Sequence, residues 1–294
     1  GKILKENIFD NIWIQPAAGD AGGALGAALA LWHIEMDNKR EVNPNDSMKG
    51  SYLGSEYSQD QVEKELLSIG ANFETLNYED LIKQTSDNLS EEKAIGWFQG
   101  RMEFGPRALG NRSILGDPRD PKLQKIMNLK IKKRESFRPF APSILEDKVD
   151  EFFNETQPSP FMNFVTKIKE DLRVSYKLHD KKLFGIDLLN VKNSIIPAVT
   201  HVDFSSRIQT VRHDTNKKFY NLIKEFYNIT KIPILINTSF NVRGEPIVRD
   251  PQDAYRCFMR TEMDILVLQN HILAKDEQHQ NNIDEDWKQE FELD

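Results

Sequence analysis

The 294-residue sequence is 39% hydrophobic and 29% charged, with a formal net charge of −7. This composition is typical of a globular chain with one large or two ordinary domains, and its acidic total argues against a general nucleic-acid-binding protein. The single cysteine, Cys257, excludes an internal disulfide, and no stretch has the length of a membrane span or the pattern of a signal peptide, so we expect a cytoplasmic protein without a membrane partner.

The chain begins with Gly1 rather than Met, so we expect it to begin inside a longer protein. Residues 12–14 predict a strand end and 15–19 a loop, and Asp20 stands at the expected N-cap of a helix rich in Ala and Gly. The small side chains let another part of the protein pack closely against this helix, or let a nucleotide bind at its N-terminus, where the helix dipole is positive. The sequence pattern does not distinguish these alternatives. The polar residues 41–59, which include Pro44, predict a linker.

Helices are expected at 58–69 and 78–83, followed by a loop at 87–92 and a strand at 94–99. This strand leads into a basic segment, Trp97 to Arg138, with eleven Lys/Arg against four Asp/Glu and thus a charge of +7. Like charges held together cost energy unless an anion relieves them. In the run GPRALGNRS (105–113), glycines permit close backbone approach, and Arg107 and Arg112 suit phosphate or carboxylate oxygens. We favour an anion site over the alternative, a solvated basic face.

The rest of the chain alternates between helical and strand patterns. A helix of roughly ten residues is expected from Asp120-Pro121. Pro139 and Pro142 indicate that the strand at 137–145 lies at an edge or begins irregularly. A helix is expected at 149–153, a strand at 161–168, and two β segments within 195–211 about a turn at 203–206. Asp214 is the expected cap of a helix with a buried apolar stripe from Phe219 to Phe226, and a central strand follows at 232–236. The last expected elements are a helix from Asp250 that buries Cys257, a strand at 264–268 and an acidic tail at 276–294.

Polar side chains gather at four places beside predicted strands, at 101–113, 132–138, 201–207 and 237–241. Ligand-binding groups commonly emerge at such positions in α/β folds. The cluster at 237–241 could cradle phosphate oxygens, or it could be a polar turn that satisfies itself. His201 and Asp203 have the spacing of one strand face. No histidines show zinc-site spacing and no nucleophile elbow is present, which favours chemistry by position and charge.

Five ordered motifs make the sequence resemble the O-carbamoyltransferases related to the nodulation and antibiotic-tailoring enzymes. The motifs are QPAAGDAGGALGAAL (15–29), GRMEFGPRALGNRSILGDPR (100–119), KKRESFRPFAPSIL (132–145), THVDFSSRIQTV (200–211) and PILINTSFNVRGEPIV (233–248). Family members resemble a fusion of an actin-like ASKHA domain, similar to the tRNA threonylcarbamoyl-transfer protein, and a YrdC-like domain, similar to the one that makes threonylcarbamoyl-adenylate.

The resemblance implies an α/β (α+β) fold, with a YrdC-like twisted mixed sheet and flanking helices. Residues 1–40 would be the terminal fragment of the actin-like domain, 41–59 the linker, 60–275 the whole YrdC-like domain and 276–294 the acidic tail. The implied reaction has two steps. Carbamoyl phosphate and ATP first give carbamoyl-adenylate, with loss of phosphate and pyrophosphate. The carbamoyl group then passes to a substrate hydroxyl, of a sugar or a natural product, in the N-terminal half.

Carried over by motif, Arg107, Lys132 and Arg138 would bind the phosphates of carbamoyl phosphate and ATP. Arg207 and Ser239 would hold the carbamoyl or α-phosphate group. The remaining candidates for cofactor binding are Arg101, Asn111, Arg112, Ser113, His201, Asn237, Thr238 and Asn241. Positioned arginines together with Mg²⁺ would neutralise the repulsion between two highly charged anions.

Asp20 matches the metal-ligand aspartate of the family's first half, but the His-x3-His motif that the family carries upstream is absent. We therefore expect only a partial metal site here, with iron or another divalent metal in the N-terminal domain of the full-length protein. Two alternatives stay open. One is an RNA- or polyanion-binding YrdC-like module without catalysis, and the other is a scaffold whose basic segment docks on the missing domain. A homodimer is also possible.

Overall fold

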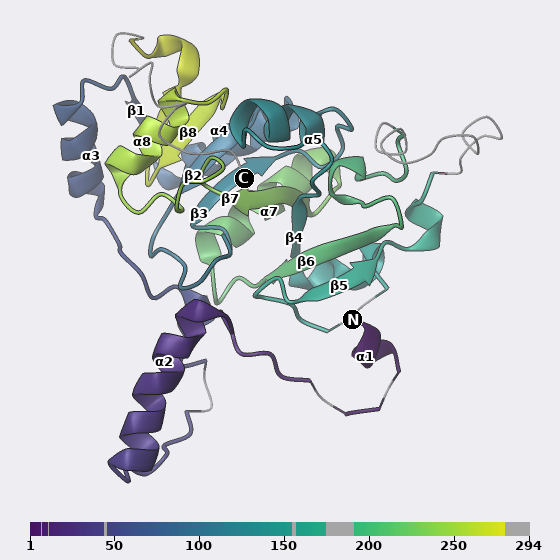
Figure 1. Cartoon of the computed structure of the whole chain (residues 1–294). Helices are drawn as coiled ribbons and strands as arrows, with labels where there is room; N and C mark the ends of the chain where they lie inside the picture. The colour runs from purple at the N-terminus through teal and green to yellow at the C-terminus, as the bar shows by residue number, and fades with distance from the viewer. Residues whose placement is uncertain (7, 11, 44–45, 155–156, 175–190, 280–294) are drawn as a thin grey trace.

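The computed structural model describes residues 1–6, 8–10, 12–43, 46–154, 157–174 and 191–279. The predicted acidic tail therefore lies almost entirely outside the described residues. Within them, a nine-stranded sheet forms the centre of the chain (Figure 1). Its strand order is β1-β9-β8-β2-β3-β7-β4-β6-β5. The strands are β1 (Glu74–Thr75), β2 (Ile95–Phe98), β3 (Arg112–Gly116), β4 (Ala141–Leu145), β5 (Phe164–Lys167), β6 (Ser205–Val211), β7 (Ile234–Ser239), β8 (Ile265–Leu268) and β9 (His271–Ala274).

The sheet is mixed, as predicted for this α/β fold. β2 pairs with β8 and β4 with β6 in parallel, while the other six pairs are antiparallel. Side chains alternate between its two faces. In β7, Ile234 and Ile236 therefore pack into one core cluster and Leu235 into the other. The predicted central strand at 232–236 is confirmed, since β7 lies between β3 and β4.

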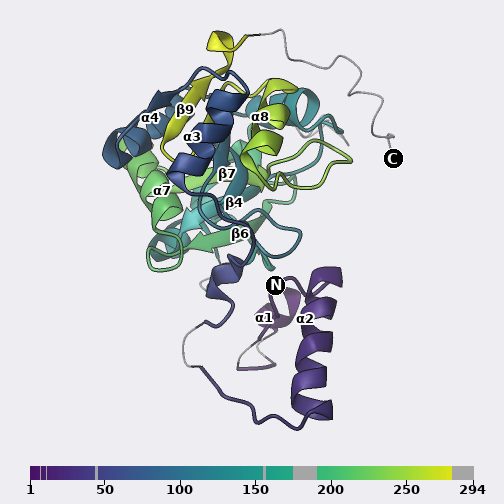
Figure 2. The same ribbon diagram turned by 90° about the vertical axis from the view of Figure 1, so that its left-hand side faces the viewer.

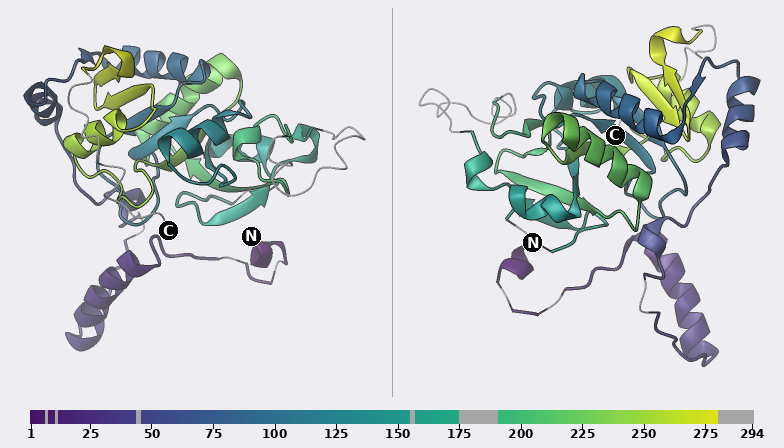
Figure 3. Two further views of the ribbon diagram at one scale, coloured as in Figure 1. Left: turned by 45° about the horizontal axis from the view of Figure 1, so that its top comes forward. Right: turned by 180° about the vertical axis from the view of Figure 1, so that it is seen from behind.

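Helices cover both faces of the sheet. Residues of α4 (Tyr78–Ser90) and α7 (Lys217–Thr230) pack into the cluster that contains Leu235, and both helices lie in front of the sheet when it is seen from behind (Figure 3, right). The opposite cluster includes residues of four helices. They are α3 (Gln59–Ser68), α5 (Leu123–Ile126), α6 (Val149–Phe152) and α8 (Pro251–Met259).

Several helix ends follow directly from the sequence. Ser58 caps α3 in a capping box with Gln61, and Asp250 caps α8, as its position before Pro251 predicted. α7 carries the predicted buried stripe, but its cap is Asn216 and not Asp214. Arg212 donates to both carboxylate oxygens of Asp214, at 3.0 and 2.5 Å, so that carboxylate is engaged elsewhere. Cys257 is buried in the core, as expected.

The β structure differs from the expectations in several places. β3 occupies a stretch for which no strand was predicted, and β9 follows the strand expected to be last. β4 lies inside the sheet, with Pro142 as its second residue, and begins at Ala141 rather than 137, so the prolines accompany an irregular start and do not mark an edge. Of the two β segments expected at 195–211, the first is a 3₁₀ turn at Pro197–Val199 and only β6 is a strand. No strand forms at 12–14.

Three helix predictions also need correction. The helix expected at 78–83 continues to Ser90, because Leu89 is buried against α7, so the predicted loop at 87–92 is mostly helix. The helix expected from Asp120 begins at Leu123 and ends in a π-helical turn at Met127–Ile131. Asp20 is the first residue of its helix, and Gly19 occupies the cap position.

The N-terminal elements α1 (Lys2–Lys5) and α2 (Asp20–Ala30) lie outside the sheet body, and α2 points away from it (Figures 1 and 2). α2 has no buried residue, and large apolar side chains such as Trp13 and Ile34 are exposed. Ala17 nevertheless packs on residues 105–111, the loop before β3 that we call the motif loop. A Cβ added to Gly105 would lie 2.5 Å from the Cβ of Ala17. In the described part of the chain, no helix has the length and hydropathy needed to cross a membrane.

Candidate functional site

Two adjoining cavities lie where the predicted polar clusters meet. The small cavity measures about 120 Å³ and is lined by Pro106, Arg107, Ala108, Arg134, Pro139, Phe140, Ala141, Met162, Arg207, Asn237, Thr238 and Ser239. The large cavity measures about 480 Å³, and its lining includes Arg134, Arg138, Phe140, Val165, Val199, His201, Asp203, Ser205 and Arg207. Arg134 and Arg207 belong to both linings, so the cavities share a cationic wall.

Arg107 and Arg207 reach the small cavity from different elements. Arg207 lies on β6, and Arg107 lies in the loop before β3. No described residue gives either guanidinium a hydrogen bond or a carboxylate partner. Partial burial and the positive charge of Arg107 lower the pKa of Arg207 below its ordinary value. Two neighbouring cations without a counter-ion are the arrangement that an anionic ligand relieves.

Arg134 is a cavity residue that the sequence analysis did not select. Its Nε donates to Asn128 Oδ1 at 2.7 Å, and its guanidinium lies 5.1 Å from the centre of the Phe140 ring. Burial and the charge of Arg138 lower its pKa to about 10. Arg138 lines the large cavity and pairs with Glu135 at 2.9 Å. The only available signal was the position of Arg134 between two residues that the motif had already singled out.

His201 belongs to the large cavity, beside Arg207. Its Nδ1 lies 3.4 Å from Asp203 Oδ1, but the two residues lie in the turn before β6 and not on one strand face as predicted. Asp203 Oδ1 also accepts from the backbone N–H of Ser205 at 3.0 Å and from its hydroxyl at 2.6 Å. The structure thus places a histidine and a carboxylate at one wall of a cavity that is otherwise cationic.

The end of β7 separates the residues of the Asn-Thr-Ser-Phe-Asn cluster. Asn237, Thr238 and Ser239 line the small cavity, whereas Asn241 lies beyond it. The Nζ of Lys132 donates to the backbone carbonyls of Ser239 and Asn241 at 2.8 and 2.7 Å, and it also contacts Asn241 Oδ1 at 2.5 Å and Ser239 Oγ at 3.2 Å. Lys132 is 3% exposed, and burial lowers its pKa to about 7. It braces the corner that carries Ser239 and lines neither cavity.

Arg112 has a different environment from Arg107, although both lie in one motif. It is fully buried, and its guanidinium lies 3.5 Å from the centre of the Phe98 ring. Burial lowers its pKa to about 10. Its side chain donates to four backbone carbonyls, those of Gln99 (2.7 Å), Asn111 (3.1 Å), Ser55 (3.2 Å) and Gly100 (3.2 Å). Arg112 therefore fixes the backbone around the motif and is not exposed to either cavity.

Glu103, which was not among the residues predicted from the motifs, accepts hydrogen bonds from the backbone of the motif loop. It is 4% exposed, and its Oε1 accepts from the backbone N–H groups of Leu109 (2.6 Å), Asn111 (2.8 Å) and Arg112 (3.3 Å). Gly110 is needed between them, because its φ is +106° and a Cβ there would lie 2.2 Å from Phe219. The base of the loop is thus fixed, and Arg107 lies at its tip.

Two further candidates also serve this loop. Ser113 is buried, and its Oγ accepts from the backbone N–H of Gly110 at 3.1 Å. Asn111 donates to the carbonyl of Arg101 at 2.7 Å and accepts from Asn216 at 2.9 Å. Neither residue lines the two cavities, so their predicted role in cofactor binding gains no support from the geometry.

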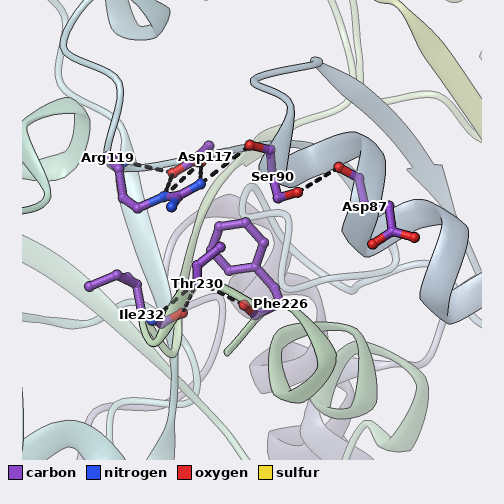
Figure 4. Close-up of polar contacts among 7 residues, drawn as sticks. All are labelled: Asp87, Ser90, Asp117, Arg119, Phe226, Thr230 and Ile232. Atoms are coloured by element: carbon purple, nitrogen blue, oxygen red, sulfur yellow. Dashed lines mark hydrogen bonds and ion pairs between the residues drawn. The ribbon is translucent and has the colours of Figure 1, made fainter. Parts of the chain in front are cut away.

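Some cations of the basic segment form separate ion pairs. Arg119 donates from Nε to both oxygens of Asp117, at 3.0 and 2.9 Å, and from Nη2 to the carbonyl of Ser90 (Figure 4). Lys130 pairs with Glu262 at 2.6 Å. Arg101, a further candidate, pairs with Glu56 at 3.2 Å and lines neither cavity.

The metal prediction is not supported by a ligand cluster. Asp20 is exposed at the start of α2, and the described residues contain no group of three His, Cys, Asp or Glu placed to hold a metal ion. Mg²⁺ likewise has no protein ligand set there. Nearly all charged groups that line the two cavities are arginines.

Comparisons with known proteins agree with the resemblance of the motifs. Residues 86–275 match the family model described as the carbamoyltransferase C-terminus, and residues 1–29 match the carbamoyltransferase N-terminus. The chain is 54% identical to the uncharacterized protein sll1178 of Synechocystis, over 100% of the chain and 48% of that protein. It is 40% identical to the nodulation protein NolNO of Sinorhizobium fredii, over 94% of the chain and 38% of that protein.

A solved structure of full-length HypF, in a phosphate- and nucleotide-bound form, is a distant match. Its TM-score is 0.39 at 15% identity, over 67% of this chain and 22% of that one. The chain spans about half the length of its curated relatives or less. One family model alone covers more than half of the chain. The chain belongs to the carbamoyltransferase family.

Proposed function

We propose that this chain contains the part of a carbamoyltransferase that forms carbamoyl-adenylate. Carbamoyl phosphate, ATP and one water would give carbamoyl-adenylate, phosphate and pyrophosphate. Family membership supports carbamoyl-group chemistry, and the paired cavities support the use of two anionic substrates. In the same proposal, residues 1–40 belong to a separate N-terminal unit and 60–275 form the catalytic domain.

The observation that carries this proposal is the cationic wall shared by the two cavities. The small cavity, of about 120 Å³, has room for a phosphoryl or carbamoyl group, while the large cavity, of about 480 Å³, has the volume of a nucleotide site. Arg134 and Arg207 line both. Two anions bound side by side repel each other, and shared guanidinium groups offset that repulsion while holding the reacting atoms close. ATP would bring Mg²⁺ on its phosphates.

Pyrophosphate release tests the proposal. The purified chain, given carbamoyl phosphate, ATP and Mg²⁺, should release pyrophosphate only when both substrates are present. Arg207→Ala should abolish the release. Arg212→Ala is the matched control, because Arg212 is a surface arginine at the end of the same region and pairs with Asp214. A folded chain that releases no pyrophosphate at saturating substrate would contradict the proposal.

The second step is proposed for the longer protein only. The carbamoyl group would pass to a hydroxyl acceptor in the N-terminal domain, with iron or another divalent metal there. The described residues offer Asp20 but no ligand cluster, so the chain alone should make the adenylate without carbamoylating an added sugar. Adding the rest of the relatives' N-terminal region should restore transfer, which mass spectrometry of the acceptor would detect.

A further inference from the structure

Asn237 is a buried residue at the end of β7 whose amide is only half satisfied. It is 1% exposed. Its Nδ2 donates to Gln209 Oε1 (2.8 Å), Ser143 Oγ (3.0 Å) and the carbonyl of Ala108 (3.3 Å), which fixes the orientation of the amide. Its Oδ1 accepts no hydrogen bond from any residue that the structure describes. A buried acceptor without a donor costs about 1–3 kcal/mol, so a ligand that supplies the donor is favoured.

The chemistry of the small cavity makes this acceptor unusual. The other polar side chains in its lining are three guanidinium groups, which only donate, and the hydroxyls of Thr238 and Ser239. Ser239 donates its hydroxyl proton to Asn241 Oδ1 at 2.7 Å. Asn237 therefore supplies the one side-chain carbonyl in a cavity built to bind an anion. A carbonyl oxygen repels phosphate oxygens, so it is useful there only to a ligand that also carries an N–H donor.

We propose that Asn237 Oδ1 accepts a hydrogen bond from the amino group of the carbamoyl moiety and thereby makes the site selective for carbamoyl phosphate over other acyl phosphates. The inference rests on the proposed function. Acetyl phosphate is the informative competitor, because a methyl group replaces the amino group at nearly the same size. It would satisfy the arginines equally well but leave Oδ1 unpaired. Sites that hydrogen-bond a substrate N–H reject analogues without it more strongly than apolar pockets reject a change of size.

Binding of three small anions to the whole chain tests the proposal. Inorganic phosphate reports on the arginines alone, and acetyl and carbamoyl phosphate differ only in the group that would face Asn237. The wild-type chain should bind carbamoyl phosphate at least about tenfold more tightly than acetyl phosphate, which corresponds to one good hydrogen bond. Asn237→Ala should bring that ratio close to one and change the affinity for inorganic phosphate much less.

Ser143→Ala is the matched control. It removes a partner of Nδ2 and disturbs the same buried network, but it leaves Oδ1 in place, so the preference for carbamoyl phosphate should persist. The wild-type ratio alone tests the proposal if Asn237→Ala does not fold. Tight binding of phosphate with equal affinity for the two acyl phosphates would overturn this inference and leave the proposed function intact. A wild-type chain that binds none of the three anions would overturn both.

Discussion

The tip and the base of the motif loop contain the same residue type in opposite environments. Arg107, at the tip, lines the small cavity without a partner among the described residues, and Arg112, at the base, is fully buried and donates to four carbonyls. The terminal nitrogens of Arg112 find acceptors that offset its burial, whereas the exposed guanidinium of Arg107, unpaired among the described residues, is available to a ligand. One short motif therefore supplies both the ligand-binding group and the scaffold that positions it.

The largest expected effect is that of Arg112→Ala on stability. This change removes four hydrogen bonds to backbone carbonyls, of which only those of Asn111 and Ser55 keep another donor among the described residues, and it removes a cation that interacts with the buried carboxylate of Glu103, so we expect a loss of about 3–5 kcal/mol. Arg107→Ala should change stability by no more than about 0.5 kcal/mol, since no described group pairs with it. Urea unfolding followed by circular dichroism measures both. Equal losses would contradict the assigned contrast between tip and base.

Arg107→Ala, which has the smaller expected effect on stability, should have a large effect on activity, because it removes a cation from the small cavity. We expect pyrophosphate formation to fall by about 10²–10³-fold while the melting temperature stays unchanged. Arg249→Ala is the control, since Arg249 is 72% exposed and pairs with Asp250 at 2.8 Å. A rate for Arg107→Ala close to that of the control would exclude Arg107 from the site.

Much of the scaffold was visible in the sequence. The apolar stripe of α7, the cap of α3 and the buried strand β7 each follow from local patterns, because neighbouring residues alone decide them. β3 was missed because the polar start of the strand, Arg112-Ser113, is typical of a loop. Its burial depends on backbone carbonyls in other parts of the chain, such as that of Ser55, which accept hydrogen bonds from the Arg112 side chain.

The site was predicted only in part for the same reason. The motifs indicated Arg107, Arg207 and Ser239, which the fold does bring to one cavity. Lys132 was expected in contact with phosphates but lies beneath the corner of β7, and Arg134 was missed although it lines both cavities. Adjacent basic residues look alike in a sequence, and only the three-dimensional path of the chain decides which one is covered.

Substitution of Glu103 tests the contrast between the tip and the base of the motif loop, because its charge and its hydrogen bonds affect anion binding in opposite directions. Removal of a negative charge should strengthen anion binding, whereas loss of three backbone hydrogen bonds should loosen the loop that carries Arg107. We expect Glu103→Ala to weaken pyrophosphate binding about tenfold, the equivalent of roughly one lost hydrogen bond, and Glu103→Gln to recover most of it. Glu56→Ala, on an exposed carboxylate, is the control. Tighter binding by Glu103→Ala would show that only its charge matters.

A further expected effect concerns Lys132 and pH. Burial lowers the pKa of Lys132 to about 7 in the folded chain, while an unfolded lysine keeps its proton up to about pH 10.4. The unfolded state binds more protons in this window, so stability rises with pH between these values. Relative to Lys132→Met, the wild-type chain should thus gain stability from pH 6.5 to pH 9.5. A constant difference would mean that the four surrounding oxygens keep the ammonium charged.

The proposed site requires that Arg107 and Arg207 converge on one anion. A crystal structure of the chain soaked with carbamoyl phosphate and ATP tests this directly. We predict a phosphoryl group in the small cavity, in contact with both guanidinium groups. A small cavity that stays empty at saturating ligand, with the anions bound elsewhere on the surface, would contradict it.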